Sequence, residues 1–148
     1  MATYTASAAQ AGVQPKGLRV GLVAVTSFYS FPASASVAMV IQMVKVPKGA
    51  TPVQVVVGNN NAGQATVQVG DGIDADRYYA ETTLSSGMGM VQVFPGGSLT
   101  TVGTPYTYSA DDTIDITISR VSVTTLGGAV YLTAIFSMDV IGSGALVP

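Results

Sequence analysis

The chain has 148 residues, of which 48% are hydrophobic and 9% charged, and its formal net charge is −2. It contains no Cys and no His, so disulfides, thiolate nucleophiles, the commonest general base and the commonest transition-metal ligand are excluded. The six basic residues are scattered and form no stripe that could neutralise phosphates, which disfavours nucleic-acid binding.

Charged residues make up only 9% of the chain, whereas they make up about 25% of an ordinary soluble domain. We therefore predict that other chains cover part of the surface. A membrane-spanning segment does not explain the low charge. The richest apolar run, Val37–Val46, is interrupted by Gln42 and Lys45 and is shorter than the roughly 18 residues that a span needs. We therefore expect a homo-oligomer. The first ten residues lack the features of a secretory signal, so we expect synthesis in the cytoplasm.

The N-terminal third of the chain predicts an arm followed by strands. Residues Met1–Gly17 show neither strand nor helix periodicity, which indicates an extended arm or, alternatively, a frayed tail. Leu18–Ser30 and Ser36–Pro47 are rich in strand-forming residues and are separated by a segment that contains Pro32. We expect them to be the first two strands.

The middle of the chain predicts a hairpin. Val53–Val57 alternates as a strand, and the Asn- and Gly-rich stretch Gly58–Gly63 leads from it into a second strand, Gln64–Gly70. Asn and Gly tolerate the positive φ angles of tight hairpin turns. We therefore expect the two strands to pair. The following segment, Glu81–Gly103, is rich in Gly, Ser and Thr.

The strongest strand pattern lies near the C-terminus. In Thr113–Val123, isoleucines alternate with Thr, Asp and Ser, as a half-buried strand requires. Ala129–Val140 alternates similarly but carries Tyr131 and Ile135 on its polar side, which marks that side as a partner-binding face. Because Thr125–Gly128 ends in two glycines, we expect these two strands to form a hairpin.

The whole pattern predicts one all-β domain. We count eight or nine short strands and no stretch of helical periodicity, which indicates a single β-sandwich over residues 18–141 with a C-terminal tail over 142–148. The length and strand number fit a jelly roll, and an immunoglobulin-like sandwich is the alternative.

The one acidic cluster is a weak metal candidate. Asp71, Asp74 and Asp76 could supply oxygens to Ca²⁺, although their spacing is not that of an EF-hand. The alternative is an Asx-type turn, in which the aspartates bond their own backbone and Arg77 balances their charge. We favour the turn and expect no metal and no other cofactor.

No residue pattern predicts catalysis. Asp111, Asp112, Asp115 and Glu81 are the only carboxylates dense enough to suggest a glycosidase pair, but carboxylates at a turn are more often solvated turn formers. The Ser and Thr residues have no base to activate them. The aromatic residues are expected in the core or at an interface, or else on a ligand-binding face. The candidates for that face are Tyr78, Tyr79 and Tyr106.

Four stretches carry structural motifs: Lys16–Val20, Val40–Ala50, Val69–Tyr78 and Tyr106–Thr117. They include a strand that ends in Val-Pro-Lys-Gly-Ala, a corner that reads Gly-Asp-Gly-Ile-Asp-Ala-Asp-Arg-Tyr, and a late strand with Asp-Thr-Ile-Asp. In this order they resemble small structural proteins of tailed-phage particles. The resemblance implies a capsid decoration or cement protein that binds the major capsid protein on the outer shell, as a homotrimer.

The sequence thus leaves two hypotheses from different classes. The first is a decoration protein whose partner contacts are made by the N-terminal arm, Met1–Gly17, and by the residues Lys16, Arg19, Tyr131 and Ile135. The second is a receptor- or carbohydrate-binding module of a phage fibre or spike, which would use the three tyrosines of the candidate ligand face. An enzyme is a distant third possibility.

Overall fold

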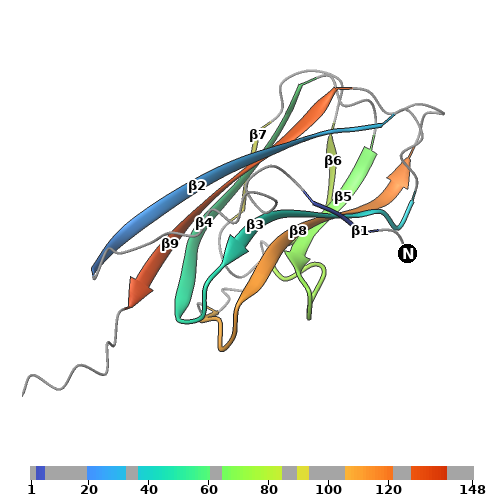
Figure 1. Cartoon of the computed structure of the whole chain (residues 1–148). Coiled ribbons are helices and arrows are strands. Elements are labelled where there is room, and N and C mark those ends of the chain that lie inside the picture. The colour runs from blue at the N-terminus through green and yellow to red at the C-terminus, as the bar shows by residue number, and fades with distance from the viewer. Residues whose placement is uncertain are drawn as a thin grey trace, which may run out of the picture.

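The computed structural model describes residues 3–5, 20–32, 37–60, 65–84, 90–93, 106–121 and 128–139. Within these ranges the chain forms nine strands and no helix (Figure 1), and hence no helix there is long and apolar enough to cross a membrane. The strands are β1 (Thr3–Thr5), β2 (Val20–Ser30), β3 (Val40–Val46), β4 (Ala50–Asn60), β5 (Ala65–Asp71), β6 (Tyr79–Leu84), β7 (Met90–Val93), β8 (Asp112–Val121) and β9 (Ala129–Asp139).

The strands form two sheets that pack face to face (Figure 1). The five-stranded sheet has the order β1-β3-β8-β5-β6, and the four-stranded sheet has the order β2-β9-β4-β7. The inward side chains of both sheets make one apolar core. The expected β-sandwich is therefore confirmed.

The strand pairing is nested, and this identifies the sandwich as a jelly roll. The antiparallel pairs are β2–β9, β3–β8, β4–β7 and β5–β6, so that each pair is enclosed in sequence by the one before it. Such nesting arises when one long hairpin is rolled up, with its innermost turn between β5 and β6. The immunoglobulin-like alternative has a different strand order.

Both predicted hairpins are wrong. β4 pairs with β7 and β9, whereas β5 pairs with β6 and β8, so the strands on either side of the Asn- and Gly-rich stretch lie in different sheets. β8 and β9 are likewise in different sheets. The reason is that turn-forming residues allow the chain to reverse but do not choose between pairing with the next strand and crossing to the opposite sheet.

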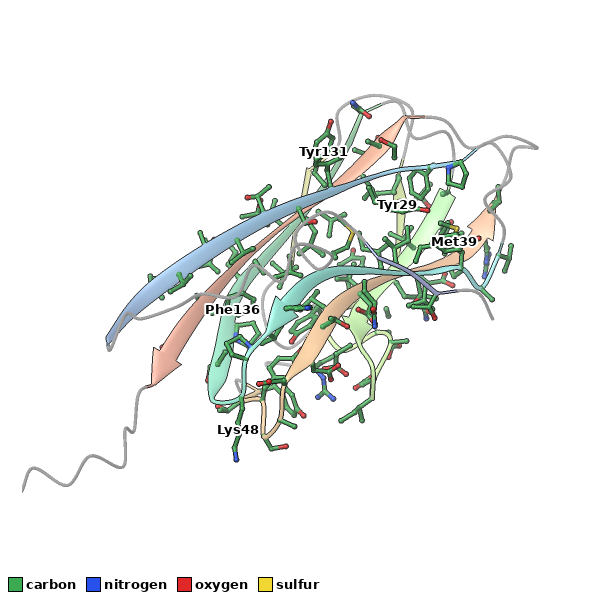
Figure 2. All side chains as sticks on the ribbon, in the orientation of Figure 1. Tyr29, Met39, Lys48, Tyr131 and Phe136 are labelled. Carbon is green, nitrogen blue, oxygen red and sulfur yellow. The ribbon has the colours of Figure 1, made fainter. Side chains whose placement is uncertain are left out.

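The alternation inferred from the sequence does place the core. Ile114, Ile116 and Ile118 of β8 have no exposed surface, and neither have Leu132 and Phe136 of β9. Figure 2 shows Phe136 in the space between the sheets. Each such side chain contributes about 1.5–3 kcal/mol relative to an exposed position.

The start of the chain adds a strand to the jelly roll. β1 lies parallel to β3 at the edge of the five-stranded sheet, and the ring of Tyr4 lies 6.1 Å from that of Tyr29 on β2. Three residues of the expected arm therefore belong to a sheet. The rest of that arm, including Lys16, lies outside the described residues, as do Arg19 and the expected C-terminal tail.

Candidate functional site

The acidic corner between β5 and β6 is organised by Asp71, which is 4% exposed. Its Oδ1 accepts hydrogen bonds from the backbone N–H groups of Ile73 (3.0 Å) and Asp74 (2.8 Å). Its Oδ2 accepts from the Nε of Arg77 and from the hydroxyl of Tyr108, the latter at 3.1 Å. Both oxygens therefore have protein donors, and the Asx-turn interpretation is confirmed.

The three aspartates of this corner are not arranged around a common point. No group of three acidic side chains in the described part of the chain has the arrangement of a metal site. Asp76 instead lies beside Asp74, and the hydrogen bond between the two carboxyls raises the pKa of Asp76. Since Asp71 is already saturated by protein donors, the corner offers Ca²⁺ no preformed set of ligands.

A tyrosine cluster fixes the corner to the core. Tyr108 gives its only hydroxyl proton to Asp71, so Tyr78 is the donor in the 2.5 Å bond between the two hydroxyls. Burial raises the pKa of both tyrosines. The guanidinium of Arg77 lies 3.7 Å from the ring centroid of Tyr106, which in turn meets Tyr108 edge to face at 5.0 Å.

The three tyrosines of the predicted ligand face mostly pack against other residues of the molecule. Tyr78 has no exposed surface and so cannot meet a ligand at the surface. Tyr79 and Tyr106 are only partly exposed and pack against the core. One side of the Tyr106 ring is also covered by Arg77. The sequence could not distinguish these roles, because tyrosine has both an apolar body and a polar tip.

Asp115 is buried, which corrects the expectation that it is solvated. It projects from the outer face of β8, yet it is 6% exposed and its Oδ1 has no hydrogen-bond partner. Its cross-strand neighbour is Gly70, where an added Cβ would come within 2.1 Å of the carbonyl oxygen of Asp74. The acidic corner thus folds back over Gly70 and covers Asp115. Burial raises the pKa of Asp115 to about 6.

The remaining candidate carboxylates hold local structure. Asp111 accepts a 2.8 Å bond from the backbone N–H of Lys48, and Asp112 accepts one of the same length from Thr113. Glu81 is exposed and lies 3.9 Å from a guanidinium nitrogen of Arg120. These contacts agree with the interpretation of Asp111 and Asp112 as turn formers.

The outer face of the four-stranded sheet carries large exposed apolar side chains together with uncharged polar ones such as Thr26 and Thr133. We define the apolar face by Leu22, Ala24 and Phe28 of β2 and by Tyr131 and Ile135 of β9, which all point away from the core. Leu22 is 66% exposed, Phe28 51% and Tyr131 39%. Cross-strand pairing sets Phe28 beside Tyr131 and Ala24 beside Ile135. Figure 2 shows Tyr131 on the side of this sheet away from the core.

Two contacts hold Tyr131 in place on the apolar face. Its ring centroid lies 6.3 Å from that of Phe28, and its hydroxyl accepts a 3.0 Å hydrogen bond from the Nδ2 of Asn60 on β4. Of the predicted partner-binding residues, Tyr131 and Ile135 thus lie together on one face. The sequence missed Leu22 and Phe28, because β2 is apolar on both faces and its pairing with β9 is remote in sequence.

The two outer faces differ in charge. Among the residues of β2, β4, β7 and β9, only Asp139 is charged, and it is the last residue of β9. The strands of the five-stranded sheet carry charged residues on β3, β5, β6 and β8. They are Lys45, Asp71, Glu81, Asp112, Asp115 and Arg120. Nearly all charged residues of the described strands thus belong to the five-stranded sheet.

No model of a protein family matches the chain, and no curated protein is similar to it in sequence. Solved structures do resemble it. A chain in the capsid of Ralstonia phage GP4 has a TM-score of 0.74 at 13% identity, over 93% of this chain and 98% of that one. The fold is one found in phage capsids.

Two further structures agree with this. A chain of the capsid asymmetric unit of cyanophage Pam1 has a TM-score of 0.67 at 19% identity, over 85% of this chain and 91% of that one. A chain in the acid-stable capsid of Helicobacter pylori bacteriophage KHP30 has a TM-score of 0.52 at 12% identity, over 81% and 94%. These identities show a common fold, which is the fold that the sequence motifs implied.

Proposed function

We propose that this protein is a structural component of a phage particle. The observation that carries the proposal is the match to the GP4 capsid chain over nearly the full length of both chains. The similarity therefore concerns two whole chains of about the same size rather than one domain of a larger protein. The matches in the Pam1 and KHP30 capsids point to the same kind of particle.

Within the particle, we assign the protein the role of a decoration or cement protein on the outer surface of the head, made in the host cytoplasm. Its partner is the major capsid protein. Two features support this role. Asp111, Asp112 and Glu81, the exposed or half-buried carboxylates of the candidate glycosidase group, hold turns or an ion pair. One outer face exposes large apolar side chains and is almost free of charge, as a surface covered by other chains requires.

The attachment to the shell is assigned to the N-terminal arm, Met1–Gly17, which contains Lys16, and to Arg19 just after it. Complete deletion of Met1–Gly17 is an imperfect test, because it also removes β1 from the sheet. A better variant keeps β1 and replaces residues 6–17 with Gly and Ser at the same length. Heads assembled from the major capsid protein alone are mixed with each protein, and the bound fraction is measured by co-sedimentation.

We expect the full chain to bind these heads and the variant to bind at least about tenfold more weakly with an unchanged melting temperature. Equal binding of both proteins would remove the arm from the proposal. Failure of the full chain to bind would instead contradict the decoration role itself. Binding to a glycan array together with that failure would favour the receptor- or carbohydrate-binding module, which the burial of Tyr78 disfavours.

A further inference from the structure

We propose that the apolar face of the four-stranded sheet binds the same face of a second copy of this chain, which forms a two-fold symmetric dimer. This inference goes beyond the decoration role, because it requires only this chain and no particle. The features that favour a second copy lie on β2, β4 and β9.

The first feature is the exposure of large apolar side chains on a single face. Leu22 and Phe28 lie six residues apart on β2, on the same face, and are 66% and 51% exposed. Tyr131 on β9 is 39% exposed, and Val53, at the irregularity in β4, is 37% exposed. Elsewhere in the described residues, the large exposed apolar side chains Tyr4, Val37 and Ile73 lie on separate segments. The apolar side chains of this face thus lie on adjacent strands, with the hydrogen-bonded pair Thr26 and Thr133 between them.

The second feature is the charge of this face. No residue of β2 or β4 is charged, and the single charge of β9 is at its last position. Two copies can therefore meet without bringing like charges together, and no ion needs to lose its water. The other charges of the described strands, including Lys45 and Arg120, belong to the five-stranded sheet, so they would remain in solvent in the dimer.

The third feature is the area. β2, β4 and β9 each have 11 residues. At about 3.3 Å per residue and 4.8 Å between strands, these three strands project about 500 Å². Two copies would bury about 1,000 Å² even before the relief of the side chains is counted. That value reaches the lower limit of specific protein interfaces.

A second copy is the favoured occupant because an uncharged sheet face can pack against the same face of another copy without opposing like charges. Two sheet faces pack about 10 Å apart with interdigitating side chains, as the two sheets of this molecule already do. A face that meets itself is related by a two-fold axis, which gives a dimer. The trimer that the phage resemblance implies would need a head-to-tail interface, and hence a second, different surface.

The test substitutes two alanines that are both exposed on a strand, one on each sheet. Ala24 is exposed in the middle of the apolar face, and Ala80 is exposed on β6 of the other sheet. Ala24→Lys would place two like charges inside the proposed dimer, whereas Ala80→Lys would leave its charge in water. The mass of the full chain and of each variant is measured by sedimentation equilibrium, with circular dichroism to verify the fold.

We expect a dimer for the full chain and for Ala80→Lys, and a more than tenfold weaker dimer for Ala24→Lys, since juxtaposed like charges cost about 2 kcal/mol or more. A monomer or a trimer for the full chain would overturn the proposal. So would equal dimerisation of the two variants. These results do not depend on binding to heads, so they are distinguishable from a failure of the decoration role.

Chemical cross-linking provides a second test that requires no lysine substitution. The chain has no Cys, so Ala24→Cys and Ala80→Cys each provide a single thiol. A short bismaleimide is added to each variant. Covalent dimers from Ala24→Cys and none from Ala80→Cys would support the proposal, and the reverse would contradict it. Heads that bind Ala24→Cys only before labelling, with no covalent dimer, would identify the shell as the occupant instead.

Discussion

The two sheets of this molecule share one core but present opposite surfaces. The outer face of the five-stranded sheet carries Lys45 and Arg120 among polar side chains, and a folded-back corner covers Asp115. The outer face of the four-stranded sheet is exposed at Leu22 and Phe28 and almost uncharged. Strand alternation is compatible with both kinds of outer face, because folding only requires that the inward side of each strand be apolar. The residues on the outward side are therefore free to match the surroundings of each sheet.

A substitution in the core tests the contribution that the two sheets share. Phe136 has no exposed surface, whereas Phe28 is 51% exposed on the opposite side of the same sheet. We expect Phe136→Ala to lower the free energy of unfolding by about 3–5 kcal/mol, because it removes contacts and leaves a cavity. Phe28→Ala at a dilute, monomeric concentration should change it by less than about 0.5 kcal/mol. Urea titration measures both, and equal losses would contradict this division of inner and outer faces.

The corner that distinguishes the five-stranded sheet is tested at Asp71. Asp71→Asn removes the charge that pairs with Arg77 and weakens the acceptor of the bond from Tyr108. We expect a loss of about 2–4 kcal/mol in the free energy of unfolding, because the partly buried guanidinium of Arg77 is left without its ion pair and a buried hydrogen-bond network is weakened. Asp76→Asn, on the exposed part of the same corner, is the matched control and should change stability by less than about 0.5 kcal/mol. A small loss for Asp71→Asn would show that the corner does not depend on this carboxylate.

The buried carboxyl of Asp115 predicts a dependence on pH. Its pKa of about 6 in the folded state lies above its ordinary value of 3.8. The folded state thus keeps a proton that the unfolded state has released, so this group reduces stability as the pH rises from about 4 to about 6. We expect Asp115→Asn to be more stable than the natural chain by about 1–3 kcal/mol at pH 7 and equal to it near pH 4. Urea titrations of both proteins at several pH values measure this, and a constant difference would argue against a raised pKa.

The smallest effect is expected on the charged surface. The ion pair between Arg120 and Glu81 is exposed and 3.9 Å long. Arg120→Ala should change the free energy of unfolding by less than about 0.5 kcal/mol, and the change should vanish in 1 M salt. A salt-insensitive loss larger than 1 kcal/mol, measured by urea titration, would show that this face is engaged in more than solvation.

Local alternation predicted the parts of the fold that depend on single strands. The isoleucines of β8 and the inward residues of β9 are in the core as expected, because a period of two residues is a property of one strand. The partner of each strand could not be predicted. β2 pairs with β9 across more than a hundred residues, as the bond between Thr26 and Thr133 illustrates. No turn residue encodes such a pairing.

The same limit applies to the candidate surfaces. Tyr131 and Ile135 could be recognised because they are apolar residues on the polar side of their strand. Phe28 could not, because β2 has apolar residues on both of its faces. Asp115 was misplaced because its burial comes from a corner that folds over Gly70, which is a neighbour only in the sheet. The Asx turn at Asp71 was predictable, since all of its partners except Tyr108 lie within six residues.

The nested strand pairing also sets an order in which the molecule can form. β5 and β6 are the only pair in the described sheets that are neighbours in sequence, so their hairpin closes the shortest loop and has the lowest entropic barrier. Each outer pair must bring together more distant strands. β2 emerges early from the ribosome and cannot pair with β9 until almost the whole chain has been made. The apolar face, which needs both strands, is therefore completed only in a finished molecule.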